Sequence, residues 1–300
     1  MAPMNKAARA SLARETINKQ IPSILASNAN AQSGVQRAQR LLGSKDLPKL
    51  PASPSQDDVA EKPSLSITFR PVDTLGAAQA LHENHPKTRV AILNMASPLQ
   101  PGGGVLRGAR AQEESLCMRS TLYPSLRSEW YRHKPDTVIY TPDVLVFKSP
   151  APHFALLDPK DQFYVDVISC AAPRHPELAE ADVGDGKTLR YADPRDEESM
   201  ALKIKYIMRT AVKMGVTHLV LGALGCGAYQ NPIQQVAGIM RRCLLGRKPG
   251  NPSEEDWVAA GVTDIVFAIL DSTPEQRVWN GFVEEFRGRE GVIIENGGTS

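Results

Sequence analysis

An apolar run followed by three glycines occupies residues 88–104 and sets the class of this fold: TRVAILNMASPLQPGGG. The segment VAIL near its start is short and continuously apolar, which is typical of a strand buried on both faces of a sheet. A helix-forming segment, residues 111–122, comes after the glycines. A buried strand that leads through a loop into a helix is the repeating unit of α/β proteins.

The same alternation of apolar strands and amphipathic helices continues from residue 65 to residue 286. Because such strands need cover on both faces, the pattern predicts a three-layer α/β/α domain. We expect strands at 65–70, 88–93, 144–147, 164–169, 218–223 and 264–270, and helices at 74–83, 111–122, 197–214, 233–245 and 274–286.

Two further segments flank this predicted domain. Residues 5–42 carry apolar side chains at helical spacing, and four prolines between residues 43 and 64 indicate a surface connector. The predicted organisation is therefore an N-terminal helical extension with its connector over 1–64, a main domain over 65–290 and a flexible tail over 291–300.

The composition limits the class of partner. The 300 residues carry 35 Lys and Arg against 33 Asp and Glu, which gives a net charge of +2. A protein that tracks nucleic acid by bulk charge has a strongly basic face, so this balance argues against direct tracking of that kind. The four cysteines form no CxxC pair and no apolar run approaches about 20 residues, so we expect no disulfide framework and no membrane span.

Neither a targeting segment nor a cofactor is expected. The first residues lack the apolar core of a secretory signal, and their mildly basic character leaves a mitochondrial leader as the disfavoured alternative to a cytoplasmic or nuclear location. The six histidines lack metal spacing, so no metal site is expected. ADVGDGKT at 181–188 resembles the end of a P-loop, but Ala181 replaces its first glycine, and we interpret it as a surface turn.

Glycine-rich loops follow two of the predicted strands. GGG at 102–104 follows the strand at 88–93, and GALGCGAYQNP at 222–232 leaves the strand at 218–223 and runs into a helix. Ligands of α/β sheets bind at the carboxyl ends of strands, where glycines let a phosphate approach backbone N–H groups. A flexible turn is the alternative for a lone GGG, but two such loops favour an anion site.

Two glutamates follow the first glycine loop. Gln112-Glu113-Glu114 opens the predicted helix, with seven residues between Gly104 and Gln112. The helix dipole is one explanation for acidic residues in a first turn. A carboxyl group beside a bound sugar, however, can protonate a leaving glycosidic oxygen and then deprotonate a water. Neighbouring helical residues project in different directions, so we expect one acid/base and one positioning carboxylate.

The order GGG, seven residues, QEE resembles the signature of the poly(ADP-ribose) glycohydrolases. NMASPLQPGGGVLRGARAQEESLCMRSTLYPSL at 94–126 is similar to the catalytic region of the microbial-type branch of that family, and LVLGALGCGAYQNP at 219–232 is similar to a later block. The resemblance covers about residues 9–286. It implies a macrodomain with a mixed central sheet.

The resemblance also implies a role for each motif residue. Glu114 would be the catalytic acid/base, and Glu113 would hold ribose hydroxyls beside the scissile bond. The branch commonly has an aromatic residue at the position of Leu224 and phenylalanine at that of Tyr229, so these two positions bear on the fit of the substrate. The ligand-binding residues would be Asn94, Gly102, Gly103, Gly104, Gln112, Gly225, Cys226, Gly227, Ala228 and Tyr229.

The implied activity is hydrolysis of the ribose–ribose O-glycosidic bonds of poly(ADP-ribose), with release of ADP-ribose through an oxocarbenium-like transition state. Such a monomeric enzyme would need no cofactor, would act on the polymer or on ADP-ribosylated proteins, and would serve the reversal of ADP-ribosylation in the DNA damage response. Two alternatives stay open, a non-catalytic ADP-ribose-binding macrodomain and a hydrolase of mono-ADP-ribosyl groups. The intact QEE favours an enzyme over the binding module.

Overall fold

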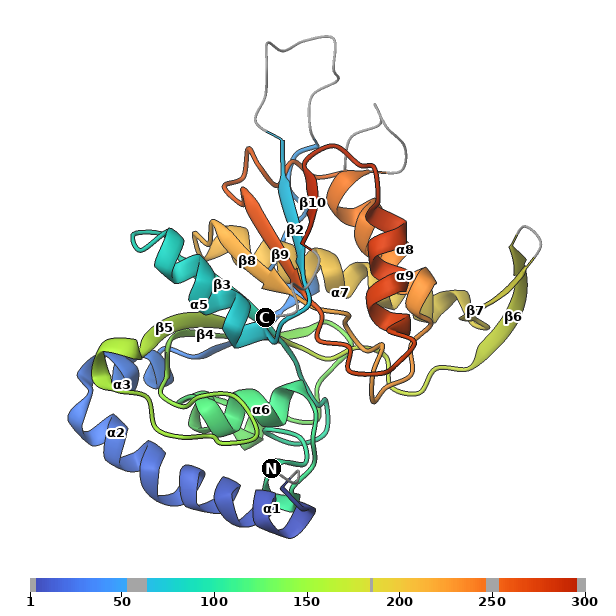
Figure 1. Ribbon diagram of the computed structural model, residues 1–300. Helices are drawn as coiled ribbons and strands as arrows, with labels where there is room; N and C mark the ends of the chain where they lie inside the picture. Colours follow the sequence, from blue (N-terminus) through green and yellow to red (C-terminus); the bar gives the residue numbers. More distant parts are fainter. Residues whose placement is uncertain (1–3, 53–63, 184–185, 247–253, 296–300) are drawn as a thin grey trace. The chain divides into compact units, whose positions relative to one another are not determined.

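The computed structural model of the chain describes residues 4–52, 64–183, 186–246 and 254–295 (Figure 1). The chain folds into two compact units. The first unit comprises residues 1–42 and 91–171, and the second comprises residues 43–90 and 172–300.

The sheet of the first unit has the strand order β1-β4-β5-β3. β1 (Gln39–Leu42), β4 (Thr137–Val146) and β5 (Phe163–Cys170) pair antiparallel, whereas β3 (Val90–Met95) pairs parallel to β5. The first five residues of β3 are all buried, which agrees with a strand covered on both faces. The sheet is therefore mixed, as the resemblance implied.

The N-terminal region is helical over most of the stretch 5–42, as expected, but its last residues form a strand. It forms α1 (Lys6–Glu15), a π-helical turn η1 (Thr16–Gln20), α2 (Ile21–Ser27) and α3 (Ala29–Gln36). Asn28 separates α2 from α3, because it leaves the helical conformation and caps α3, its side chain accepting the N–H of Ala31 at 2.9 Å. Residues 39–42 then pair with β4 as β1.

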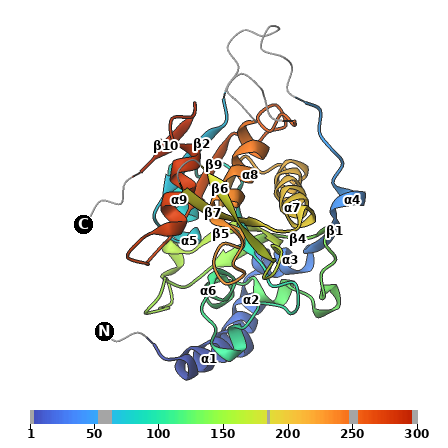
Figure 2. The same ribbon diagram turned by 90° about the vertical axis from the view of Figure 1, so that its right-hand side faces the viewer.

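Helix α1 packs beside the segment that follows the three glycines. This segment contains a short 3-10 turn, η3 (Val105–Arg107), and helix α6 (Gln112–Arg119), and α1 contacts both (Figure 2). Residues 1–42 are thus an integral part of the packed first unit. The remaining 3-10 turns of this unit are η4 (Tyr123–Ser125), η5 (Ser128–Trp130) and η6 (Pro159–Asp161).

The sheet of the second unit is entirely parallel. Its order is β8 (His218–Leu221), β9 (Asp264–Ala268), β2 (Ser66–Arg70) and β10 (Val292–Ile294). β10 lies inside the stretch 291–300 that we expected to be a flexible tail, because its backbone pairs with β2. Residues 296–300 lie outside the described residues.

Helices cover both faces of this parallel sheet. α5 (Thr74–Asn84) lies on one face, and α8 (Ile233–Leu245) and α9 (Arg277–Phe286) lie on the other (Figure 1). Aromatic rings fill the space between sheet and α9: Phe69 and Phe267 stack with ring centroids 4.8 Å apart, and Phe286 lies 5.2 Å from Phe267. The long α7 (Pro194–Lys213) packs against α8.

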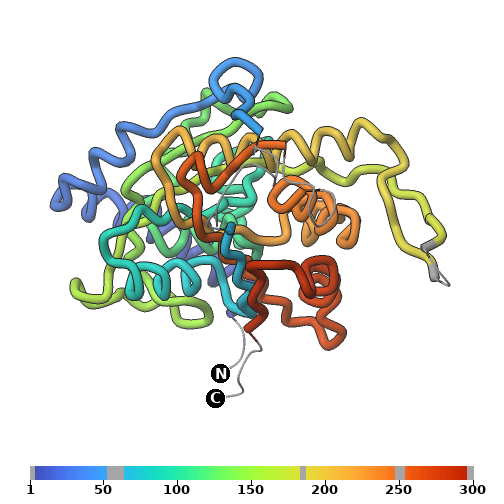
Figure 3. The backbone as a smooth tube through the Cα atoms, turned by 90° about the horizontal axis from the view of Figure 1, so that it is seen from above, coloured from blue at the N-terminus to red at the C-terminus, as the bar shows by residue number. Residues whose placement is uncertain are grey.

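An antiparallel hairpin, β6 (Leu178–Val183) and β7 (Gly186–Tyr191), projects beyond α8 (Figure 3). The octapeptide at 181–188, interpreted as a surface turn, belongs to this hairpin, since Ala181 pairs with Thr188. Its residues 184–185 lie outside the described residues. Both strands were missed because polar, alternating residues on an exposed hairpin give no apolar run.

The structure describes residues 43–52 of the predicted connector. Residues 43–46 form α4 (Gly43–Asp46), and Leu47 is buried after it. Leu50 donates its N–H to the carboxylate of Glu255 at 2.8 Å, and Arg209 holds the same carboxylate with two bonds of 2.8 Å. Residues 53–63 of the connector lie outside the described residues.

The predicted mixed α/β class is confirmed. Every strand and helix expected between 65 and 286 is present, and α8 has the expected bounds. β4 is the largest difference, because it begins at Thr137 and not at 144. None of the helices in the described part of the chain is both long and apolar enough to cross a membrane.

Candidate active site

The side chain of Gln112 joins the start of α6 to the end of β3. Its Nε2 donates to the carbonyl oxygen of Leu93 at 2.6 Å, and its Oε1 accepts the N–H of Met95 at 2.9 Å. Both ends of the amide are therefore engaged by the backbone of the strand. Gln112 places the first turn of α6, with the two glutamates, at the carboxyl end of β3.

Glu113 points back to the residues that leave β3. Its Oε2 accepts the N–H of Ser97 at 2.7 Å, and its Oε1 accepts a longer bond of 3.4 Å from Nδ2 of Asn94. Asn94 is fully buried and also donates to Oγ of Ser169, at 3.0 Å, on the neighbouring strand β5. Asn94 and Ser97 thus fix the carboxyl group of Glu113.

Glu114 faces the three glycines. Its Oε1 accepts the N–H of Gly104 at 2.7 Å. The loop around it is closed by Val105 and Ala109, whose N–H groups donate to the carbonyl oxygens of Gly102 and Gly104 at 3.1 Å each. The loop therefore presents its backbone to the carboxyl group of Glu114 at hydrogen-bond distance.

These contacts exclude the simple helix-dipole explanation for the acid pair. Only 3% of Glu113 and 7% of Glu114 is exposed, whereas acidic residues that serve a dipole lie in solvent at the helix end. Moreover, the carboxyl groups accept hydrogen bonds from Ser97, Asn94 and Gly104, which lie outside α6. The two carboxyl groups, in the first turn of α6, are thus held by the segments that precede the helix.

Two acceptors of this cluster are left over. Oε2 of Glu114 and Oδ1 of Asn94 are buried and accept no hydrogen bond from the described residues. A buried acceptor without a donor costs free energy and occurs mainly at functional sites. These two atoms are therefore placed to accept hydroxyl groups of a bound molecule.

Burial raises the pKa of Glu113 above that of an ordinary glutamate. It raises the pKa of Glu113 to about 8, and the neighbouring Glu114 adds to this, while the hydrogen bonds from Ser97 and Asn94 oppose it. In the free protein at neutral pH, Glu113 is thus mostly protonated. The same burial raises the pKa of the Cys117 thiol, which lies one turn further along α6.

The second glycine loop belongs to the second unit and links β8 to α8. Its turn is held by Asn231, whose Nδ2 donates to the carbonyl oxygens of Pro173 at 2.8 Å and Gly225 at 3.1 Å. Tyr191, at the end of β7, donates its hydroxyl to Oδ1 of Asn231 at 2.8 Å. Asn231 and Tyr191 were not among the expected site residues, because nothing in the sequence places the hairpin beside this loop.

The tip of this loop offers unused donors. Gly227 and Ala228 are exposed, and their N–H groups donate to no acceptor among the described residues. A Cβ atom added to Gly227 would meet no atom within 4 Å. Packing therefore does not demand a glycine there, whereas a ligand that came close to the backbone would.

Two neighbours of the tip have different environments. Cys226 is buried, and burial raises the pKa of its thiol, so the loop at this position offers backbone and not a thiolate. Tyr229 is half-buried, and its carbonyl oxygen accepts the N–H of His175 at 3.1 Å. Leu224, the position at which the family commonly has an aromatic residue, is fully buried.

The expected residues thus fall into two local groups. Asn94, the three glycines and the QEE triplet meet in the first unit, and residues 225–229 form one turn in the second. Ser97 and Ser169 were missed, although Ser97 stands in the block at 94–126 that carried the resemblance. Among the described residues, no group of three or more His, Cys, Asp or Glu side chains could hold a metal ion.

Comparison with known proteins finds a family model that matches part of the chain. Residues 18–149 match the family model of the microbial-type PARG catalytic domain. This stretch contains Asn94, the three glycines at 102–104 and the acid pair. No curated protein matches the sequence of the chain.

Solved structures agree with the family match. The poly(ADP-ribose) glycohydrolase of Thermomonospora curvata superposes with a TM-score of 0.72 at 25% identity, covering 93% of this chain and 100% of that chain. The same enzyme bound to the inhibitor ADP-HPD gives 0.71 at 26% identity, with the same coverage. The poly(ADP-ribose) glycohydrolase of Deinococcus radiodurans in complex with ADP-ribose gives 0.65 at 26% identity, covering 85% of this chain and 96% of that chain.

Proposed function

Because this chain is an enzyme of the microbial-type poly(ADP-ribose) glycohydrolase kind, we propose that it cleaves the ribose–ribose O-glycosidic bonds of poly(ADP-ribose) and releases ADP-ribose, with Glu114 as the only acid/base. The observation that carries this proposal is the environment of Glu114. One oxygen is held by the N–H of Gly104, and the other, Oε2, is buried with no donor among the described residues. A carboxyl group oriented through one oxygen has the other available for proton transfer.

The first step breaks the bond between the anomeric carbon and the 2′-oxygen of the next unit. Protonated Glu114 gives its proton to that oxygen, which leaves as a hydroxyl group while an oxocarbenium-like centre develops at the anomeric carbon. In the second step a water attacks this centre and transfers a proton to the Glu114 carboxylate. The acid is thereby regenerated, and the net change is addition of one water across one glycosidic bond.

Glu113 and Asn94 position the sugar. Glu113 contacts ribose hydroxyls beside the scissile bond. Because burial raises its pKa to about 8, Glu113 is mostly neutral at pH 7 and adds little negative charge to the site. Asn94 offers its unpaired Oδ1 to a hydroxyl of the distal ribose.

The diphosphate is bound without lysine or arginine at the glycine loops. The N–H groups of Gly227 and Ala228 are exposed and donate to no acceptor among the described residues, so they are available to phosphate oxygens. Backbone donors do not appear in a count of charges, so a net charge of +2 is compatible with a polyanionic substrate.

Substitution of Glu114 by glutamine tests this proposal. Glutamine keeps the acceptor for the N–H of Gly104 but cannot exchange a proton, so E114Q should lose hydrolysis of labelled polymer by more than about 1000-fold while it still binds ADP-ribose. Binding is measured by calorimetry and turnover by release of labelled ADP-ribose. Turnover at the level of the unsubstituted chain would remove Glu114 from the reaction.

The same assay separates the remaining substrate classes. Labelled polymer and a mono-ADP-ribosylated protein are incubated in parallel with the unsubstituted chain, and the products are resolved by size. Release of ADP-ribose from the polymer is the expected result. Activity on the mono-modified protein alone, or binding without any cleavage, would contradict the proposed substrate.

We propose poly(ADP-ribose) and ADP-ribosylated proteins as partners and a monomer as the acting form.

A further inference from the structure

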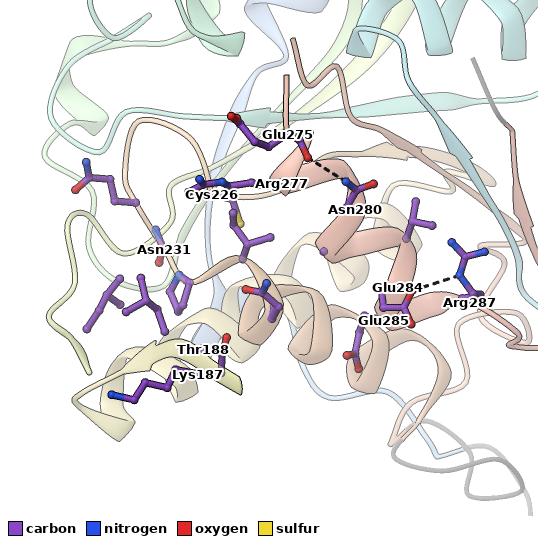
Figure 4. Close-up of a pocket in the computed structure, with 18 residues that line it drawn as sticks. Lys187, Thr188, Cys226, Asn231, Glu275, Arg277, Asn280, Glu284, Glu285 and Arg287 are labelled. Atoms are coloured by element: carbon purple, nitrogen blue, oxygen red, sulfur yellow. Dashed lines mark hydrogen bonds and ion pairs between the residues drawn. The ribbon is translucent and has the colours of Figure 1, made fainter. Parts of the chain in front are cut away.

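A groove of about 970 Å³ runs along the second unit between the β6–β7 hairpin, the second glycine loop and α9 (Figure 4). Cys226 and Gln230 line it from the loop, Lys187 from β7, and Arg277 and Asn280 from α9. Its volume is within the range of pockets that bind small organic ligands, about 300–1000 Å³. The groove therefore begins at the loop to which we assign the diphosphate and continues away from it.

Most charges in the groove are neutralised by a partner. Lys187 pairs with Glu180 at 2.7 Å, and Arg287 pairs with Glu284 at 3.4 Å. The carboxylate of Glu285 is held by Arg241, at 2.7 Å, from α8. The exposed Glu275 is the acidic group that remains.

Arg277 differs from these cations. It is exposed and has no ion pair or hydrogen-bond partner among the described residues. Figure 4 shows its side chain directed from the start of α9 toward the loop that carries Cys226. An arginine without a carboxylate presents all of its donors to a ligand, and phosphate matches its planar fork.

The segment that carries Arg277 is held in place. Asp271 accepts the N–H groups of Val278 at 2.8 Å and Trp279 at 3.3 Å, both in the first turn of α9. Thr273 donates both its N–H, at 3.1 Å, and its hydroxyl, at 2.7 Å, to the same carboxylate. Although partial burial opposes it, these bonds hold the pKa of Asp271 below its ordinary value, so the carboxylate stays charged and the start of α9 stays anchored.

We propose that this groove binds a second ADP-ribose unit of the polymer, and that Arg277 donates hydrogen bonds to a phosphate of that unit. The inference rests on the proposed function, because it takes the loop at 225–228 as the site of the first diphosphate. The groove then distinguishes a polymer from ADP-ribose alone. Lys187 and Arg287 contribute less than Arg277 to polymer binding, because each already pairs with a carboxylate.

The experiment measures binding separately from cleavage. In the E114Q background, dissociation constants for length-fractionated fluorescent polymer and for ADP-ribose are compared among chains with Arg277, with R277A and with R287A. R287A is the matched control, because it removes the same charge from the same groove at an arginine that is already paired. All three proteins are first shown to unfold at the same temperature.

The expected result is specific to the polymer. R277A should weaken polymer binding by about 5- to 10-fold, the effect of one charge-assisted phosphate contact at an exposed site, and leave ADP-ribose binding unchanged. R287A should change neither by more than about twofold. Equal affinities of R277A and the control for polymer, or an equal loss for polymer and ADP-ribose, would overturn the inference.

Failure of the proposed function has a different signature. If the unsubstituted chain binds polymer but releases no ADP-ribose from it, the proposed hydrolytic role of Glu114 is wrong. The proposed binding of a second unit in the groove is then still tested by the dissociation constants of R277A and R287A. If R277K restores polymer binding only in part, the planar fork of arginine contributes beyond its charge, as a phosphate contact requires.

Discussion

Gly103 and Glu114 lie so close together that a Cβ atom on Gly103 would stand 2.6 Å from Oε1 of Glu114. The φ angle of Gly103 is +56°, a conformation that other residues rarely adopt. The next residue, Gly104, donates its N–H to the same oxygen at 2.7 Å. The acid/base that we propose is thus placed by backbone, at a position where the loop has no room for a side chain.

Alanine at position 103 should therefore displace Glu114. We expect G103A to cost roughly 1–2 kcal/mol of stability through its positive φ angle and to lower polymer turnover by more than about 10-fold through the misplaced carboxyl group. Thermal unfolding and kcat are the measurements. G215A is the matched control, because Gly215 has a φ of +68° but no atom within 4 Å of an added Cβ. It should lose similar stability and keep its turnover; equal turnover in both variants would contradict the placement.

Gly227 presents the opposite case. A Cβ there meets no protein atom within 4 Å, so G227A should unfold at the temperature of the unsubstituted chain. Its methyl group would nevertheless lie where a phosphate approaches the exposed N–H groups, and we expect ADP-ribose affinity to fall by about 10-fold, or about 1.4 kcal/mol. Calorimetric titration checks this. Full affinity in G227A would show that the phosphate is bound elsewhere.

The raised pKa of Glu113 makes stability depend on pH. Because burial raises it from 4.5 to about 8, the folded chain holds this proton at pH values where the unfolded chain has lost it. The free energy of unfolding should then fall as pH rises from about 4.5 to about 8 and level off above. E113Q removes the titrating group but keeps an acceptor for the N–H of Ser97. The unfolding temperature of E113Q, relative to that of the unsubstituted chain, should therefore be higher at pH 8.5 than at pH 5. Parallel curves for both proteins would contradict the raised pKa.

Helix α1 should support catalysis from outside the site. Nε of Arg9 donates to the carbonyl oxygen of Gly108 at 3.1 Å, and Gly108 is so close to α1 that an added Cβ would lie 2.1 Å from the carbonyl oxygen of Lys6. Ala109, the next residue, packs on Gly104 and donates to its carbonyl oxygen. R9A should loosen this segment and lower kcat by about 5-fold, with a smaller change in ADP-ribose affinity.

The control for R9A lies on the same helix. Arg14 is exposed and donates to the carbonyl oxygen of Leu106 at 3.3 Å, a longer bond to the same segment. R14A should therefore reduce kcat less than R9A does. Equal kcat values in R9A and the unsubstituted chain would show that α1 does not position the glycine loop.

The strands and helices between 65 and 286 were predictable because their apolar side chains repeat with the period of each element. VAIL at the start of β3 and the apolar spacing of α8 are examples, and both elements are present where expected. Residues 39–42 and the β6–β7 hairpin were not predicted. Their strands depend on backbone pairing with β4 and with each other, which leaves no apolar pattern in the sequence.

The identity of the site residues and the geometry of the site have different origins. GGG, QEE and the glycines at 225 and 227 indicate the chemistry through their resemblance to the poly(ADP-ribose) glycohydrolases, because backbone N–H groups can bind a phosphate and a carboxyl group can protonate a leaving glycosidic oxygen. The division of labour within QEE depends on folding. Both ends of the Gln112 amide are hydrogen-bonded to the backbone of β3. Burial raises the pKa of Glu113, and Oε2 of Glu114 accepts no hydrogen bond from the described residues.

The order of residues was thus enough to predict the α/β class, the resemblance to the family and the pair of glycine loops, since periodicity and motif spacing are properties of the chain itself. Burial, the unpaired oxygens, the anchoring of the glycine loop by α1 and the free guanidinium of Arg277 arise only when distant segments meet. They depend on which groups lose water and which donors come within about 3 Å, and no local pattern specifies either.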